Sequence, residues 1–230
     1  MEQEIKTLQK TSLFQGFSPA EIEVLLHDLQ AGHKTCEKGE LLLLAGYNVQ
    51  QIGILLAGTA EAMRQNPGSV EFTMVYLTAG SVFGDILVVS QTPSPVSLVA
   101  SSPCTVLRIP YPFLQPEKGH SHLYRQLSEN LLAEISLKYF SLDRRIALLL
   151  IRGLRQRISA YLLEESRGRS RFALPFGRQA LARYLGCDRS ALCRELSRMA
   201  RDGLIVVSRR EIGILSRTLL NNIAGGAAAL

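Results

Sequence analysis

The spacing of apolar positions along the chain changes twice, and each change predicts a different kind of structure. Between residues 33 and 109, apolar runs of five to seven residues alternate with glycine-containing breaks at intervals near ten residues. Short runs at this spacing are typical of antiparallel strands in a β-sandwich or β-roll. From about residue 121 onward the apolar positions recur at helical intervals instead. The pattern therefore predicts an α+β chain in which an antiparallel, jelly-roll-like β-roll is followed by helices.

A helix is also predicted ahead of the roll, because the segment SPAE forms a capping box. Ser18 is the expected N-cap, Pro19 takes the first helical position and Glu21 reaches back to the backbone of the cap. Phe17 and Ile22 are placed to form a hydrophobic staple across the same turn.

A long helix is predicted over residues 121–152, because apolar side chains recur there at intervals of four or seven. Such a narrow stripe is typical of the seam of a coiled coil. A solitary helix of this length needs a partner, and the simplest partner is a second copy of the chain. Packing of the helix on its own roll is the alternative, and the two arrangements can coexist. The residues assigned to a homodimer interface are Leu127, Leu131, Ile135, Leu142, Ile146 and Leu149.

Two short helices separated by a tight turn are predicted between residues 174 and 199. Leu181 and Leu185 give the first helix an apolar inner face. Gly186 tolerates a positive φ in the turn, and Asp188 can cap the second helix. An apolar back and a basic front on the second helix are the signature of a helix-turn-helix. The back consists of Leu192, Leu196 and Met199, and the front of Arg189, Ser190, Arg194, Ser197 and Arg198.

The remaining segments complete the predicted domain organisation. Residues 203–215 contain two apolar runs around a polar turn, which predicts a two-stranded wing. Arg152 and Gly153 interrupt the helical pattern and are the expected hinge. We predict an effector-sensing roll domain over 1–120, a dimerisation helix over 121–152, a winged helix-turn-helix DNA-binding domain over 153–218, and a disordered tail over 219–230.

The charge of the chain is divided unevenly between its two halves. The net charge is +6, but residues 144–230 hold 17 arginines, no lysine and six acidic residues, whereas residues 1–143 carry a net −5. A strongly basic C-terminal module is expected to face a polyanion, and arginine suits phosphate groups and guanine edges because its donors form a planar fork. Double-stranded DNA is the predicted partner.

Several other classes of protein are not expected. The four cysteines form no CxxC pair, so neither a disulfide framework nor a zinc site is predicted. The start of the chain lacks the apolar core of a signal peptide, and the longest apolar run, residues 146–151, is far too short to span a membrane. We therefore expect a soluble cytoplasmic protein. No catalytic triad or paired carboxylates are legible, so no enzyme activity is predicted.

Short motifs stand at the borders of the predicted elements, and together with the domain order they resemble the CRP/FNR family of bacterial transcription regulators. The resemblance covers about residues 8–217. The motifs are Lys38-Gly39-Glu40, Gly58, the run from Gly80 through Phe83 and Gly84 to Asp85, Arg178-Gln179, Asp188-Arg189-Ser190 and Gly203-Leu204-Ile205.

The resemblance implies a set of DNA-contacting residues. In this family an arginine, a glutamate and a second arginine one turn later read bases in the major groove. Arg189 and Arg194 match the arginines, but Ser190 stands where the glutamate is expected and cannot accept from cytosine in the same way. The family's usual half-sites therefore cannot be assumed. Arg178 and Gln179 match positions that touch phosphates, and Ala191 and Arg198 complete the expected set.

The effector side departs from the family pattern. Members that bind cyclic AMP carry a glycine–glutamate pair and, further on, an arginine–serine pair. Here the pairs correspond to Gly84-Asp85 and to the segment 94–97, which has no arginine. A buried phosphate without a cation is costly, so cyclic nucleotide binding is not expected. The expected pocket is lined by Phe83, Gly84, Asp85, Ile86, Ser94, Pro95, Val96, Ser97, Leu142 and Asp143.

The identity of the effector or cofactor stays open. The mainly apolar lining suits a small hydrophobic or aromatic ligand, or a redox or gas-binding cofactor. An iron–sulfur cluster needs four cysteines, and the N-terminal half has two, so this cofactor is not expected. Haem is left open, although the histidines are more simply solvated polar residues. Its candidate axial ligands are His27, His33, His120, His122, Cys36 and Cys104.

These observations favour a homodimeric DNA-binding regulator that reads an inverted repeat and is switched by a small effector. If the regulator is an activator, RNA polymerase is a further partner. The alternative is a constitutive DNA-binding regulator with a ligand-free, degenerate sensor domain, and a response to cyclic nucleotides is the least favoured reading. A cupin-type metalloenzyme is rejected, because His120 and His122 lie outside the predicted strands and no glutamate follows at ligand spacing.

Overall fold

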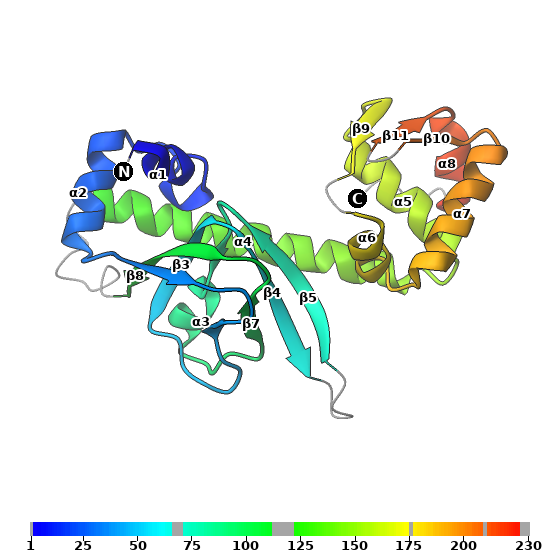
Figure 1. Ribbon diagram of the computed structural model, residues 1–230. Coiled ribbons are helices and arrows are strands. Elements are labelled where there is room, and N and C mark those ends of the chain that lie inside the picture. Colours follow the sequence, from blue (N-terminus) through cyan, green and yellow to red (C-terminus); the bar gives the residue numbers. More distant parts are fainter. Residues whose placement is uncertain (1, 66–70, 112–121, 175–176, 209–210, 226–230) are drawn as a thin grey trace. The chain divides into compact units, whose positions relative to one another are not determined.

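The computed structural model describes residues 2–65, 71–111, 122–174, 177–208 and 211–225 and divides the chain into two compact units (Figure 1). The first unit is Met1–Lys138 and the second is Tyr139–Leu230. The border lies inside the long helix α4 (His122–Leu150), so the first part of α4 belongs with the roll and the last part with the C-terminal unit.

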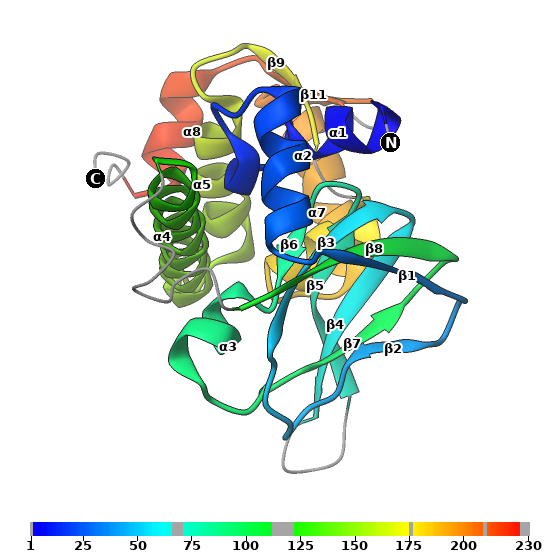
Figure 2. The ribbon, with the colours of Figure 1, turned by 90° about the vertical axis from the view of Figure 1, so that its left-hand side faces the viewer.

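Two four-stranded antiparallel sheets form the β-roll of the first unit, as the sequence predicts (Figure 2). One sheet has the order β1-β8-β3-β6 and the other the order β2-β7-β4-β5. The strands are β1 (Gly32–Cys36), β2 (Leu41–Leu43), β3 (Gln51–Ala57), β4 (Thr59–Gln65), β5 (Glu71–Thr78), β6 (Val82–Phe83), β7 (Ser97–Ala100) and β8 (Cys104–Pro110). The helices of this unit are α1 (Glu2–Leu8), the 3-10 helix η1 (Ser12–Phe14), α2 (Pro19–Asp28) and α3 (Asp85–Ser90).

The first sheet separates two apolar cores, because its side chains alternate between two faces. Ile54 and Leu107 are opposite each other in neighbouring strands and pack against α1, α2 and the first part of α4. Leu55 and Val106 are the next opposed pair and pack between the two sheets. The short apolar runs of the sequence thus serve both cores of the roll.

Two cysteines that are distant in the sequence meet in this sheet. Cys36 of β1 lies directly opposite Cys104 of β8, and both are buried, free thiols. Burial raises the pKa of the Cys104 thiol, and the neighbouring Cys36 raises it further. The absence of a CxxC pair therefore did not mean that all the cysteines are far apart, and only the register of β1 on β8 brings these two together.

The N-terminal helices close one side of the roll, and their local signals are confirmed. The side chain of Ser18 accepts from the backbone of Glu21, and the Glu21 carboxylate accepts from the backbone N–H of Ser18 at 2.8 Å. The carboxylate also accepts from the Ser18 hydroxyl, and the two bonds from the backbone and the hydroxyl of Ser18 lower the pKa of Glu21. Phe17 and Ile22 are both buried in the core beneath.

The first part of α4 packs onto its own unit, which corrects part of the predicted dimer interface. Leu127 and Leu131 are 0% and 2% exposed and belong to the core with α1 and α2, and Ile135 is partly buried against it. They are apolar because they face the roll. The apolar side chains of α4 that remain exposed include Leu142, Ile146 and Leu149 of the predicted interface, and also Leu132, Leu137, Tyr139, Phe140 and Leu150.

The second unit is a winged helix-turn-helix with more regular structure than the sequence predicts. A third strand pairs with the two wing strands in the order β10-β11-β9. A helix follows the wing within the predicted disordered tail, because Leu220 is fully buried in the core of the unit. That prediction is therefore wrong for residues 219–223, and residues 226–230 lie outside the described part. The elements are α5 (Leu154–Ser166), β9 (Arg171–Ala173), α6 (Arg178–Tyr184), α7 (Arg189–Arg201), β10 (Ile205–Val207), β11 (Glu211–Ile214) and α8 (Arg217–Ile223).

The predicted break at Arg152 and Gly153 is present, but it lies inside the second unit. Helix α4 ends at Leu150 and α5 begins at Leu154, with Gly153 in an extended conformation at the N-cap. Both residues fall on the same side of the border between the units. Within the described residues, no helix has the length and apolar character needed to cross a membrane.

Leu131→Ala is expected to lower the free energy of unfolding by about 2–5 kcal/mol, because truncation of a buried leucine leaves a cavity. Leu137→Ala is the matched control on the same helix, where the side chain is 61% exposed, and it should change the free energy by no more than about 0.5 kcal/mol. Urea unfolding followed by circular dichroism measures both. Equal losses would contradict the placement of Leu131 in the core.

Candidate functional site

The helix-turn-helix forms as the apolar spacing of its two helices predicts. Leu181 and Leu185 are buried on the inner side of α6 and the turn. On α7 the inner face is equally well buried, and all these side chains share one core with α5 and α8. The inner face of α7 consists of Leu192, Leu196 and Met199, each no more than 2% exposed.

The turn between α6 and α7 depends on Gly186. Its φ is +62°, and a Cβ atom there would lie 2.7 Å from a methyl carbon of Leu149 at the end of α4. The backbone conformation therefore favours glycine, and a Cβ atom would also displace the Leu149 side chain. Asp188 holds the N-cap position of α7, but its side chain makes no capping hydrogen bond, which corrects the predicted role of that carboxylate.

The outer face of α7 presents basic side chains to solvent. Arg189, Ser190, Arg194 and Arg198 are exposed, and Ala191 is half-buried between the two faces. The face is a ready contact surface for a polyanion, because three guanidinium groups lie on a single helix.

The single acidic side chain of α7 is turned away from this face. Arg155 of α5 donates from Nε to Glu195 at 2.6 Å and from a terminal nitrogen to Asp202 at 2.5 Å. Hydrogen bonding to Glu195 is the main reason that the pKa of Arg155 is raised. Arg198 reaches the second oxygen of Glu195 only at 3.5 Å. Sequence reasoning missed Arg155, which fixes α7 on α5 and reduces the negative charge that α7 presents.

A second arginine of α5 ties the turn to the chain that enters the helix. Arg157 donates to the carbonyl of Ile151 at 2.7 and 3.1 Å and to the carbonyl of Leu185 at 2.6 Å. These charge-assisted bonds satisfy carbonyl groups at the ends of α4 and α6. The sequence contained no local signal for this role, because the two carbonyl groups come from separate helices.

The two residues that open α6 differ in their availability. Gln179 is exposed, whereas Arg178 is half-buried and donates to the carbonyl of Ser208 in the wing at 3.3 Å. Arg178 thus has a structural contact that the resemblance did not imply. A second nitrogen of its guanidinium is buried with no hydrogen-bond partner within the described part of the chain.

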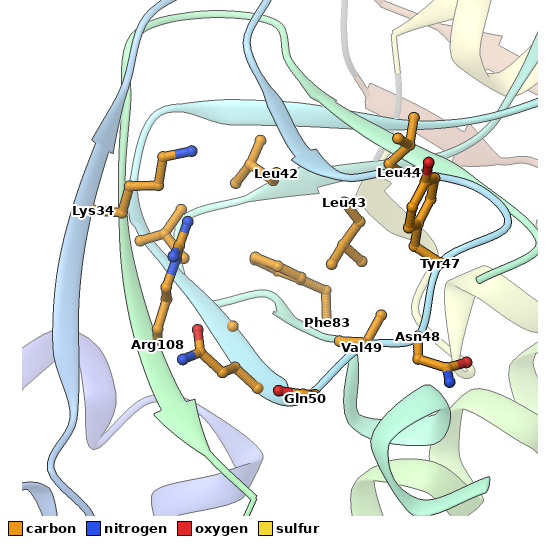
Figure 3. A pocket seen from close by; sticks show the side chains of 13 residues that line it. Lys34, Leu42, Leu43, Leu44, Tyr47, Asn48, Val49, Gln50, Phe83 and Arg108 are labelled. Carbon is orange, nitrogen blue, oxygen red and sulfur yellow. The ribbon is translucent and has the colours of Figure 1, made fainter. Parts of the chain in front are cut away.

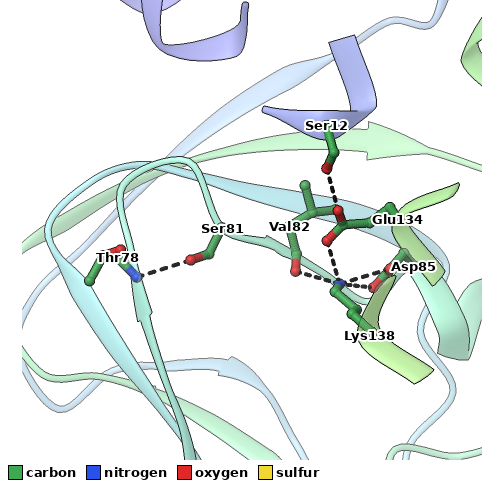
Figure 4. Close-up of polar contacts among 7 residues, drawn as sticks. All are labelled: Ser12, Thr78, Ser81, Val82, Asp85, Glu134 and Lys138. Carbon is green, nitrogen blue, oxygen red and sulfur yellow. Dashed lines mark hydrogen bonds and ion pairs between the residues drawn. The ribbon is translucent and has the colours of Figure 1, made fainter. Parts of the chain in front are cut away.

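The acid of the predicted effector pocket is engaged by a lysine of α4 (Figure 4). Asp85, at the start of α3, is 3% exposed, and both its oxygens accept from Lys138 Nζ, at 2.8 and 2.9 Å. Lys138 also donates to the Val82 carbonyl at 2.9 Å and pairs with Glu134 at 3.2 Å. Glu134 in turn accepts a hydrogen bond from Ser12 of η1.

The other residues of the predicted pocket differ in burial and in hydrogen bonding. Ser94 is buried and its hydroxyl donates to the carbonyl of Val96 at 2.6 Å, while Ile86 and Pro95 are exposed. The Ser97 hydroxyl accepts from the backbone of residue 45. Leu142 and Asp143 belong to the second unit and are exposed.

A different cavity, of about 320 Å³, is present in the roll (Figure 3). Of the predicted pocket residues, only Phe83 lines this cavity, and the predicted set stays a prediction. Lys34, Tyr47 and Arg108 also line it, and the sequence analysis did not single them out. A basic residue on the inner face of a strand would have been the signal for such a site. The sequence does not show which face is the inner one, because that depends on how β1, β3 and β8 pair.

The candidate haem ligands are scattered. Cys36 and Cys104 are buried in the roll, His33 contacts Glu4, and His27 and His122 are exposed. His120 lies outside the described residues. No group of three or more His, Cys, Asp or Glu side chains among the described residues is arranged to hold a metal ion.

Two family models match the chain, one over each of the units described above. The Crp-like helix-turn-helix domain matches residues 156–223, and the cyclic nucleotide-binding domain matches residues 33–116. The first match includes α8, in agreement with the burial of Leu220.

Known proteins resemble the chain over most of its length. It is 23% identical to the cyclic AMP receptor protein of Thermus thermophilus over 224 residues, which are 96% of this chain and 100% of the relative. The structure of a regulatory protein from Silicibacter pomeroyi DSS-3 is 25% identical with a TM-score of 0.54, covering 98% of this chain and 100% of the other. FixK2 from Bradyrhizobium japonicum shares the fold, with 20% identity, a TM-score of 0.61 and coverage of 86% and 99%.

Gly186→Ala is expected to destabilise the second unit more than Gly168→Ala. Both glycines have a positive φ, so alanine costs about 1–2 kcal/mol at either position. At Gly186 the new Cβ would also meet Leu149, whereas nothing lies within 4 Å of it at Gly168. Differential scanning calorimetry of the full chain measures the difference. An equal shift of the melting temperature in the two variants would show that Leu149 does not restrict the turn.

Proposed function

Because the chain belongs to the CRP/FNR family of transcription regulators, which are not enzymes, we propose that it binds an inverted-repeat operator as a homodimer. We further propose that a small effector other than a cyclic nucleotide, or a redox or gas-binding cofactor, switches it. The observation that supports the DNA interface is the outer face of α7, with its exposed arginines and an acid turned back onto Arg155. Binding to chromosomal DNA would place the protein in the cytoplasm.

The proposed reading of DNA follows from the order of side chains on α7. The N-terminal end of a recognition helix enters the major groove, so Arg189, Ser190 and Arg194 would reach base edges. A bidentate arginine selects guanine, while a serine discriminates less. Arg198 and Gln179 are exposed for phosphate contacts. Arg178 would have to give up its bond to the wing in order to contact a phosphate.

The proposed homodimer is supported by the apolar side chains that α4 leaves exposed. Leu132, Tyr139, Leu142, Ile146 and Leu149 follow the alternating three- and four-residue steps of a coiled-coil seam when the partly buried Ile135 is included. Exposed apolar side chains at this spacing lose their contact with water when a second copy of the helix packs on them. Two recognition helices in a dimer would contact half-sites about one turn of DNA apart.

The proposal of an effector other than a cyclic nucleotide is supported by the state of Asp85. A carboxylate that holds a ribose hydroxyl must be free to accept from it, whereas both oxygens of Asp85 already accept from Lys138. The segment 94–97 offers Ser94, whose hydroxyl is used internally, and no arginine. These residues do not fit a cyclic nucleotide phosphate and ribose.

The same ion pair is the observation in favour of a second candidate, a constitutive regulator whose roll holds no ligand. Because Lys138 already compensates the buried carboxylate of Asp85, the folded roll needs no ligand to stabilise that charge. The two candidates differ in one measurement: operator affinity with and without a metabolite extract of the source cells. An unchanged affinity supports the constitutive regulator. If the protein is an activator, its bound dimer would also contact RNA polymerase.

The proposed DNA binding is tested by selecting operator sequences from random duplex DNA with the full chain. An enriched inverted repeat is expected. Its affinity should fall steeply with salt, because arginine–phosphate contacts release counterions. Enrichment of a single, unrepeated site would contradict the dimeric reading, and no enrichment at all would contradict sequence-specific binding.

Arg194→Ala is expected to weaken binding to the selected operator by about 1–3 kcal/mol and to relax its specificity at one base pair, as for the loss of a bidentate guanine contact. Arg64→Ala removes the same charge from an exposed position of the roll and is the control. Fluorescence anisotropy with a panel of operator variants measures both. If the Arg194→Ala protein binds every operator in the panel as tightly as the wild-type protein does, Arg194 does not contact a base.

Leu142→Glu is expected to convert the dimer to a monomer, because it places a charge in the proposed seam. The neighbouring Ser141 is also exposed, and Ser141→Glu adds the same charge outside the seam. Sedimentation equilibrium of both variants gives the association state. A dimer that tolerates Leu142→Glu as well as Ser141→Glu would place the interface elsewhere.

A further inference from the structure

We propose that the cavity of the β-roll binds a small organic anion, whose carboxylate or phosphate group is held by Lys34 and Arg108 and whose apolar or aromatic body lies against Phe83 (Figure 3). The role of this anion as an effector rests on the proposed function, whereas its binding does not. The cavity shares only Phe83 with the residues matched to a cyclic nucleotide site.

The strand register places both cations on the inner face of the roll. Lys34 of β1 is opposite Val106 of β8, and Arg108 lies two residues further along β8. Residues directly opposite each other, and residues two apart in one strand, share a face of the sheet. Val106 is 2% exposed in the core between the two sheets, so the side chains of Lys34 and Arg108 start on that same inner face.

Neither cation is neutralised by the protein in the described part of the chain. The side chains of Lys34 and Arg108 make no ion pair or hydrogen bond with a described residue, and no aspartate or glutamate lines the cavity. Both side chains are half-buried. Withdrawing two like charges from water without a counter-ion is costly, and an anion between them removes that cost.

The remaining lining defines the chemistry of the ligand. In Figure 3 the ring of Phe83 lies in the middle of the cavity, with Lys34 and Arg108 on one side and Tyr47 on the other. Phe83 can take this position because its partner in the sheet is Gly53, where a Cβ atom would collide with the ring. An aromatic floor beside two cations suits a ligand with a flat apolar body and an acidic group.

The size and shape of the cavity favour a small molecule over a protein segment. Its volume of about 320 Å³ is at the lower end of the range for small-molecule sites, about 300–1,000 Å³. The side-chain amides of Asn48 and Gln50 add neutral donors at the edge. The guanidinium group of Arg108 can donate to two oxygens of one carboxylate or phosphate, while the ammonium group of Lys34 donates to the same anion.

Isothermal titration of the full chain with phenylacetate, phenyl phosphate and the neutral phenylacetamide tests the proposal. The two anions should bind saturably, and at least about tenfold more tightly than the amide, since a charge-assisted pair is lost in the amide. Equal affinity for the amide and the anions, or no saturable binding of either anion at millimolar concentration, would overturn the site.

The double variant Lys34→Gln/Arg108→Gln should weaken binding of the anions by at least about tenfold. Lys38→Gln/Arg64→Gln removes two exposed cations of the same unit and should bind as the wild type does. Unchanged anion binding in the first variant would overturn the assignment of these two residues. Should that variant fail to fold, the single variants Lys34→Gln and Arg108→Gln replace it. Each should weaken anion binding and leave binding of the amide unchanged, and unchanged anion binding in both would overturn the assignment.

A separate measurement addresses the effector role. Operator affinity is measured with each anion at a saturating concentration and without it. A change that the Lys34/Arg108 variant abolishes supports the role of the site as a switch. Binding of an anion with no change in operator affinity leaves the site standing and contradicts the effector role, whereas an absence of operator binding under any condition contradicts the proposed function itself.

Discussion

The ammonium group of Lys138 adds a polar attachment of α4 to the roll, beside the apolar contacts of Leu127 and Leu131. This group contacts the Val82 carbonyl, both carboxylate oxygens of Asp85 and the carboxylate of Glu134. A carboxylate as buried as that of Asp85 costs several kcal/mol unless a cation and hydrogen bonds compensate it. The roll can bury this acid only while α4 lies against it. Through Glu134 and Ser12 the same group of contacts also reaches the N-terminal 3-10 helix.

The basic face of α7 depends on a comparable arrangement in the second unit. Arg155 and Arg157 both donate hydrogen bonds within the protein. Because Arg155 engages Glu195, the only acid of α7, the outer arginines of α7 remain exposed. Some arginines of this half therefore hold α5, α7 and the turn together, whereas others, on the outer face of α7, are exposed. Net charge alone could not separate them.

Local structure could be predicted from the sequence because its determinants lie within a few residues of one another. The capping box at Ser18, the apolar spacing of α7 and the positive φ at Gly186 each leave a signal in the residues nearby in the chain. The sequence did not predict the helix after the wing, because it is followed by small residues that are typical of disorder. The helix is held by the buried side chain of Leu220, and this burial depends on the tertiary structure.

Contacts that depend on strand register or on the direction of a helix face could not be predicted. The apolar stripe of α4 combines residues that pack on the roll, such as Leu131, with residues that stay exposed, such as Ile146. The apolar spacing in the sequence is the same for the two groups, so it does not show which residues are buried. Likewise, Cys36 meets Cys104, and Lys34 joins Arg108, only through the pairing of β1 with β8. Such pairings are properties of the folded sheet.

The contact between Leu149 and Gly186 has a mechanical consequence. The last turn of α4 occupies the space beside the turn of the helix-turn-helix, and Arg157 holds the carbonyl groups of Ile151 and Leu185 together. The segment with Arg152 and Gly153, the predicted hinge, thus lies between two sets of contacts that connect α4 to the turn. A rotation of the end of α4 would therefore either displace the Leu149 side chain from its place beside Gly186 or move the turn before α7 with it.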